Sequence, residues 1–186
     1  MTDTAGPPNG HGAKAEPIAS WYLIDAQDRI VDLCPEWDQV ALLGGARSGS
    51  LRDGVIGRPL SRFIADDMTR MYMEALLQSC RLSHRPRNLP YRCDTPDLLR
   101  EMEMHLQPLP NDQVRVEHRL LKSSPRSSRY AAQPMTFGSD RRLWRCSMCL
   151  RLGERTPQGR WSEASAAIDP KVQVLYTLCP SCRQTR

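Results

Sequence analysis

The sequence predicts an α+β protein in two parts, an antiparallel sheet with flanking helices followed by a small cysteine-bearing module. Residues 100–107 and 114–122 alternate apolar and polar side chains, the pattern of strands that bury one face. Residues 66–82 repeat apolar side chains at three- and four-residue steps, which predicts a helix. Near the C-terminus, two Cys-x-x-Cys pairs predict a metal-stabilised unit.

The first part is predicted to begin with a hairpin and a short helix. Residues 21–25 and 29–33 are short apolar runs on either side of a polar turn, which predicts strand, turn and strand. Residues 35–43 begin with proline, which is favoured at the first helical position, and two glycines follow their end. We therefore predict a helix at 35–43 and a loop at 44–54.

The long helix and three strands complete this part. Asp66 and Asp67 suit the positive end of the helix, and prolines 86 and 90 close the region after it. Strands are predicted at 91–93, 100–107 and 114–122. The predicted core face of the helix comprises Met68, Met71, Tyr72, Ala75, Leu76, Ser79 and Cys80.

Three short motifs in this part resemble those of PAS domains. Residues 23–31 (Leu-Ile-Asp, then Asp-Arg-Ile-Val) are similar to the opening hairpin of that family, and residues 35–37 (Pro-Glu-Trp) to the start of its first helix. Residues 55–60 (Val-Ile-Gly-Arg-Pro-Leu) are similar to its characteristic turn. The resemblance covers roughly 21–122 and implies a five-stranded antiparallel sheet with flanking helices. It also implies a sensory or interaction module, which in this family often signals through dimers or attached domains.

The resemblance leaves the ligand of this domain unknown, with no ligand at all as one alternative. Some PAS domains bind haem, flavin or small metabolites, but the helix 66–82 has no histidine for haem iron. Cys80 also lacks the sequence setting of the flavin photoreceptors of this class. We interpret Cys34, Cys80 and Cys93 as small apolar residues buried in the core, and His105 and His118 as ordinary strand residues rather than ligands. Methionines 68, 71, 73, 102 and 104 are interpreted as core, with a cavity lining as the alternative.

Composition divides the chain into four predicted segments. Residues 1–17 are rich in Gly, Pro, Ala and Thr and are predicted to be a disordered leader, followed by the PAS-like domain at 18–122. Residues 123–140 are polar and rich in helix and strand breakers, which predicts a flexible linker before the cysteine module at 141–186. No secretory signal and no apolar run of about 18 residues is present, so we expect a cytoplasmic protein that does not enter a membrane.

The four paired cysteines, Cys146, Cys149, Cys179 and Cys182, are predicted to hold a structural zinc ion in a zinc-ribbon-like module. A set of four thiolates leaves no open position for water, so we expect no catalysis by this metal. The alternatives are redox chemistry, a disulfide, or a cluster or other metal. A redox pair of the thioredoxin type follows a strand at a helix start in a βαβ unit, and the residues around Cys146 and Cys179 do not predict that setting. Removing one ligand, as in Cys179→Ala, is expected to unfold 141–186 and leave 21–122 folded.

The charge distribution points to partners of the C-terminal part. Residues 1–122 hold 15 Lys/Arg against 17 Asp/Glu, whereas 123–186 hold 11 against 4. Trp144 and Trp161 lie among the arginines of this C-terminal part. Stacking on nucleobases is one candidate role of these tryptophans, and covering the metal is the role we favour. The sequence has no phosphate loop, no Ser-His-Asp set and no paired-carboxylate site, so we predict a regulatory protein that binds a protein partner rather than an enzyme. The alternatives are a transcriptional regulator whose basic ribbon binds DNA, and a haem, flavin or redox sensor.

Overall fold

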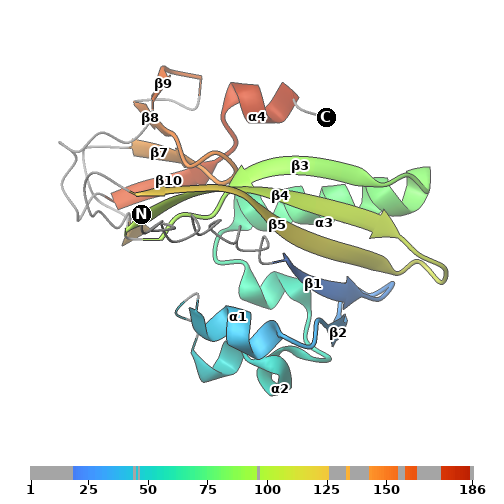
Figure 1. The fold of residues 1–186 in the computed structure, drawn as a ribbon. Coiled ribbons are helices and arrows are strands. Elements are labelled where there is room, and N and C mark those ends of the chain that lie inside the picture. Colours follow the sequence, from blue (N-terminus) through green and yellow to red (C-terminus); the bar gives the residue numbers. More distant parts are fainter. Residues whose placement is uncertain are drawn as a thin grey trace, which may run out of the picture.

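The computed structural model describes residues 19–43, 45, 47–95, 97–125, 133–134, 143–154, 158–162 and 173–184. The described residues form two sheets of five strands each, with the longest helix against the first sheet (Figure 1). The predicted leader 1–17 and most of the predicted linker 123–140 lie outside this description. Within it, no helix combines the length and apolar character needed to cross a membrane.

The first sheet is antiparallel throughout, with the strand order β2-β1-β5-β4-β3. The alternating segments became its two long central strands, because each buries one face: Met104 and Leu106 of β4 point into the core, as do Val114 and Val116 of β5. The strands are β1 (Ala19–Ile24), β2 (Ile30–Leu33), β3 (Arg87–Arg92), β4 (Leu98–Pro108) and β5 (Val114–Pro125). The α+β class and the five-stranded antiparallel sheet are confirmed.

The start of β3 and the end of β5 differ most from the prediction. Pro90 lies inside β3 instead of closing the preceding region, and β3 begins at Arg87. This position tolerates proline because β3 is an edge strand, where one side needs no ladder hydrogen bond. Strand β5 continues to Pro125, and Pro125 lies opposite Leu98 of β4.

Short helices connect the first hairpin to the long helix. They are α1 (Trp37–Leu43), the 3₁₀ turn η1 (Ser48–Ser50), α2 (Arg52–Val55) and the 3₁₀ turn η2 (Leu60–Phe63). The expectation of a loop at 44–54 was therefore wrong in its last part. Arg52 anchors α2 to the hairpin by donating to the carbonyl oxygens of Leu33 and Cys34, both at 2.9 Å.

Helix α3 (Asp67–Ser83) crosses one face of the first sheet (Figure 1). Asp66 caps its N-terminus by accepting a hydrogen bond from the Thr69 amide at 2.8 Å, and His84 ends it in the left-handed conformation. The predicted core face was wrong in part, because Met71 is 62% exposed and Met68 is 38% exposed. The buried residues are Met73, Leu77, Cys80 and Arg81.

The second sheet has the order β6-β10-β7-β8-β9 and is mixed. Strand β10 runs parallel to β6 and β7, and the pairs β7–β8 and β8–β9 are antiparallel. Its elements are β6 (Gln133–Pro134), β7 (Leu143–Cys146), β8 (Leu152–Glu154), β9 (Trp161–Ser162) and β10 (Gln173–Thr177), followed by α4 (Pro180–Gln184).

The two sheets share one hydrophobic core. Cys146, Met148, Leu178 and Cys179 belong to the same cluster of buried side chains as the core of the first sheet. The amide of Arg92, at the end of β3, donates to the Met148 carbonyl oxygen at 2.7 Å. The cysteine-bearing part therefore packs directly against the end of the first sheet.

Candidate metal centre

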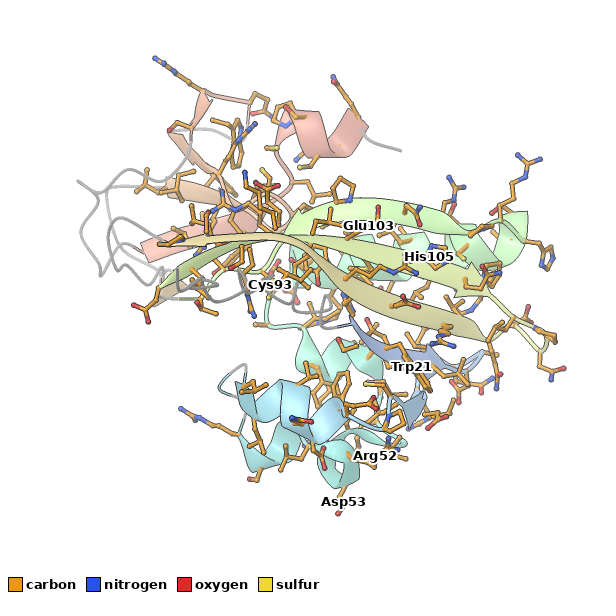
Figure 2. All side chains as sticks on the ribbon, viewed as in Figure 1. Trp21, Arg52, Asp53, Cys93, Glu103 and His105 are labelled. Atoms are coloured by element: carbon orange, nitrogen blue, oxygen red, sulfur yellow. The ribbon has the colours of Figure 1, made fainter. Side chains whose placement is uncertain are left out.

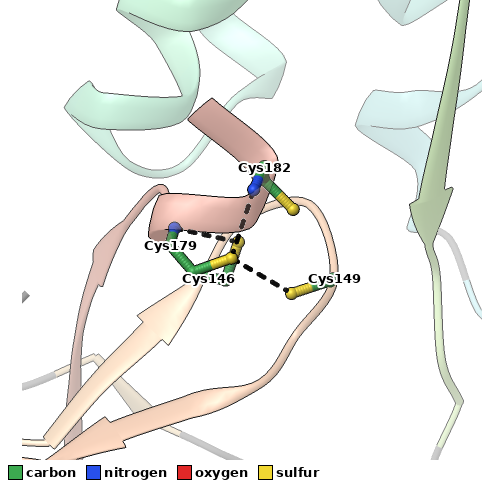
Figure 3. A group of neighbouring side chains, drawn as sticks. All are labelled: Cys146, Cys149, Cys179 and Cys182. Carbon is green, nitrogen blue, oxygen red and sulfur yellow. Dashed lines mark hydrogen bonds between the residues drawn. The ribbon is translucent and has the colours of Figure 1, made fainter. Parts of the chain in front are cut away.

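The structure brings the four paired cysteines together. Cys146 is the last residue of β7, Cys149 lies in the turn after it, Cys179 precedes α4 and Cys182 lies within α4. The four sulfur atoms all lie within 4.8 Å of one another (Figure 3). Two segments 30 residues apart thus contribute one pair of thiols each to a single group that could hold a metal ion.

Local hydrogen bonds form the first cysteine turn, residues 146–149, which holds Cys146 and Cys149. The Cys146 amide donates to the Arg151 carbonyl oxygen at 2.9 Å, and the Leu150 amide donates to the Cys146 carbonyl oxygen at 3.0 Å. Leu150 has a φ of 59°, which reverses the chain into β8. The Ser147 amide donates to the Thr177 carbonyl oxygen at 2.9 Å, which joins this turn to the end of β10.

In the second cysteine turn, residues 179–182, backbone amides point at cysteine sulfur atoms. The Cys179 amide lies 3.4 Å from the Cys146 sulfur, and the Cys182 amide lies 3.4 Å from the Cys179 sulfur (Figure 3). Amide donors of this kind support the negative charge of metal-bound thiolates.

The spacing of the sulfurs suits a tetrahedral metal ion. Four sulfurs placed about 2.3 Å from one zinc ion in a tetrahedron are about 3.8 Å from each other. The Cys149 and Cys179 sulfurs are 3.7 Å apart. A disulfide requires about 2.05 Å, and all seven cysteines of the chain are free thiols.

The clustered sulfurs also shift the pKa values of their neighbours. Hydrogen bonds from the Cys149 and Cys182 thiols hold the pKa of Cys146 well below its ordinary value. The hydrogen bond with the Cys146 sulfur raises the pKa of Cys149 to about 12 and also raises that of Cys182. One thiolate is therefore stabilised by thiol donors, and a cation among the sulfurs would favour deprotonation of the others.

The surroundings of Cys179 and Cys182 differ from the prediction that no strand-to-helix setting lies there. Cys179 follows strand β10 and directly precedes helix α4, so the strand-to-helix setting of a redox pair is present there. The sequence did not predict this helix, because α4 has only five residues, of which one is a proline and another is the ligand Cys182. Among the described residues no strand follows α4, so the βαβ unit of the thioredoxin type is not formed there.

The two tryptophans of this part lie on different strands. Trp161 of β9 lies against the backbone of β8, since a Cβ added to Gly153 would come within 2.8 Å of its ring. Trp161 also packs against the shared core, which agrees with a covering role. Trp144 of β7 is half-buried, and its indole nitrogen has no hydrogen-bond partner among the described residues.

The three remaining cysteines and the strand histidines do not join the cluster. Cys34 and Cys80 are buried, as expected. Cys93 is exposed in the segment after β3, so its interpretation as a buried apolar residue was wrong (Figure 2). His105 lies on β4 beside Asn88, and His118 of β5 contacts the Tyr91 hydroxyl.

A cavity lies next to the cluster, and the sequence did not predict that the cysteine-bearing part forms one side of it. It has a volume of about 510 Å³ and is bounded by the first sheet, its helices and the first cysteine turn. Met73 and Met104 line it, so the cavity alternative for the methionines holds for these two. Ser147, Met148 and Tyr176 of the second part also line it. For Ser147 and Met148, the only sequence signal was an apolar residue between two metal-ligand cysteines.

Comparison with known proteins gives a distant structural likeness. No family model matches the sequence, and no curated protein matches it. A domain of an HTR-like protein from Haloarcula marismortui ATCC 43049 resembles the fold with a TM-score of 0.41 and 15% sequence identity. The match covers 56% of this chain and 98% of that one. A likeness of this size carries no conclusion about function.

Proposed function

We propose that this chain is a regulatory protein that acts by binding, with a PAS-type sensory domain followed by a structural zinc module that contacts a protein partner. The order of elements supports the PAS-type domain. Two strands, a group of short helices, one long helix and three strands follow each other, as the PAS-like motifs of the sequence imply.

The zinc site rests on a single observation, the convergence of four cysteine sulfurs within 4.8 Å. Thiolate ligands favour zinc among the common divalent ions, and four of them fill its coordination shell. The metal in this proposal stabilises the fold and performs no reaction. Its binding free energy supports a short-stranded sheet that has few buried residues among those that the structure describes.

Metal analysis of the purified full chain tests this proposal. We expect one zinc per chain, and the spectrum of tetrahedral thiolate coordination after substitution with cobalt. Cys179→Ser should lose most of the metal because three ligands remain. Cys93→Ser is the matched control, since it removes an exposed thiol outside the cluster and should keep one zinc.

Two results would contradict the proposed site. One is a metal-free protein in which Cys179 and Cys182 exchange readily between thiol and disulfide, which would indicate a redox pair. The other is the broad visible absorption of an iron–sulfur cluster.

A further inference from the structure

The cavity beside the cluster has the size and lining of a small-molecule site. Its volume of about 510 Å³ lies within the roughly 300–1,000 Å³ typical of such sites. Aromatic and apolar side chains from the first sheet and its helices form most of the wall, among them Tyr22, Trp37 and Met104. Ser147, Met148 and Tyr176 of the second part complete it.

The polar groups of the wall indicate the chemistry of the ligand. Asp66 already accepts two hydrogen bonds from Thr69, and Arg92 pairs with Asp94 at 2.6 Å, so both charged groups already have partners within the protein. The Ser147 hydroxyl is buried and has no hydrogen-bond partner among the described residues. The wall therefore suits an uncharged, mainly apolar molecule with one hydrogen-bonding group.

Ser147 and Met148 are also the two residues between the first pair of metal ligands. Coordination of Cys146 and Cys149 would fix both ends of this two-residue segment. Its backbone is joined to both parts of the protein, through the Ser147 amide to Thr177 and through the Met148 carbonyl oxygen to Arg92. A metal ion at the cluster would therefore help to fix this part of the cavity wall.

We propose that metal binding and ligand binding are linked through this wall: the metal-loaded cluster completes a site for an uncharged apolar small molecule. The ligand then binds more tightly to the metal-loaded protein, and by thermodynamic reciprocity it raises the metal affinity by the same factor. The inference rests on the proposed zinc site. It adds that the site regulates the cavity, which a purely structural ion would not do.

Titration with N-phenyl-1-naphthylamine, an uncharged apolar fluorophore, tests the linkage in the full chain. We expect the zinc-loaded protein to bind the probe about 5- to 150-fold more tightly than the chelator-treated protein, the usual range of such coupling. Hydrogen exchange of α3 and β4 in the same metal-free sample must show that the first sheet remains folded. Equal affinity with and without zinc would overturn the linkage while leaving the zinc site intact.

Variants of the first turn separate the wall from the metal. Met148→Ala keeps all four ligands, so it should hold one zinc but bind the probe about as weakly as the metal-free protein. Met148→Leu preserves the apolar volume and should retain the effect of zinc. Pro180→Ala is the matched control, because Pro180 lies in the second cysteine pair, is exposed and does not line the cavity.

Two further results would overturn the proposal. One is a Met148→Ala protein that holds zinc and binds the probe as tightly as the unaltered chain. The other is zinc-loaded protein that does not bind the probe. If the chain holds no zinc at all, the proposed metal site itself fails, and the metal measurement shows this separately from the fluorescence.

Discussion

At the scale of single residues, His118 is the most strongly perturbed base of the first sheet. It lies on β5 between Tyr22 and Tyr91, with ring centroids 5.5 and 5.6 Å away, and its Nδ1 is 2.8 Å from the Tyr91 hydroxyl. Burial lowers the pKa of His118 from 6.5 to about 4 and raises that of Tyr91. The imidazole is therefore neutral at neutral pH, and it shares a hydrogen bond with the Tyr91 hydroxyl.

The depressed pKa of His118 predicts a loss of stability in mild acid. Between pH 6.5 and about 4 the unfolded chain binds one proton more than the folded chain, so the free energy of unfolding falls as the pH falls through this window. The loss amounts to about 1.4 kcal/mol per pH unit and about 3 kcal/mol in total. Urea unfolding at several pH values should show a shallower pH dependence for His118→Gln than for the unaltered chain.

His105→Gln is the matched control for this measurement. It also removes a strand histidine, but one that lies beside Asn88 on the opposite face of the sheet from the buried Met104 and Leu106. Acid also releases thiolate-bound metal, and that effect is common to all three proteins. Parallel pH profiles for all three would show that His118 does not titrate with the depressed pKa.

At the scale of elements, Arg81 fastens α3 to two turns of the first sheet. Its guanidinium group donates to the carbonyl oxygens of Asp112 at 2.9 Å and Asp25 at 2.8 Å, and to the Asp28 carboxylate at 2.7 Å. The side chain is only 8% exposed. Asp25 and Asp28 belong to the turn between β1 and β2, and Asp112 to the turn between β4 and β5, so one side chain joins three elements.

Replacement of Arg81 by methionine is predicted to destabilise the first sheet by about 3 kcal/mol, because it leaves two carbonyl oxygens and a carboxylate without their donor. Arg85→Met removes the same charge from an exposed position near the helix end and should cost less than about 0.5 kcal/mol. Chemical denaturation monitored by circular dichroism measures both. Equal effects would show that Arg81 contributes only its charge.

The elements also show which features the sequence could predict. The alternation in β4 and β5 defined both the strands and their buried faces, because every second residue of a strand meets the same layer. The face of α3 was harder to predict because methionines occur on several sides of the helix. Packing against β4 and β5 selected Met73 and Leu77 instead of Met68 and Met71, whereas Cys80 was predicted correctly.

In the candidate site, too, the sequence predicted the features that depend on neighbouring residues and missed those that depend on contacts between distant segments. The Cys-x-x-Cys spacing is local, and it correctly predicted that four thiols would converge. The parallel pairing of β10 with β7 and the packing of Met148 onto β3 are contacts between distant segments. A single sequence contains the strands but not their partners, so the cavity wall formed by the first cysteine turn could not be predicted.

At the scale of the whole molecule, the shared core changes what loss of the metal should do. Independent parts would leave 21–122 unaffected by Cys179→Ala, as the sequence alone suggested. The structure instead buries Met148 and Leu178 in the same cluster as the core of the first sheet. Unfolding of the cysteine-bearing part would therefore expose one end of that core.

Amide hydrogen exchange in Cys179→Ala should show this loss as a gradient through the molecule. The amides of Ser147 and Cys182 should lose protection, and the Arg92 amide should lose it with them, because its acceptor is the Met148 carbonyl oxygen. The Cys34 amide, which donates to the Trp21 carbonyl oxygen at 2.9 Å within the first sheet, should stay protected. Cys93→Ala should leave all four unchanged. A protected Arg92 amide beside an unprotected cysteine-bearing part would show that the two parts fold independently, whereas loss of protection at Cys34 would show that the metal holds the whole chain in one cooperative unit.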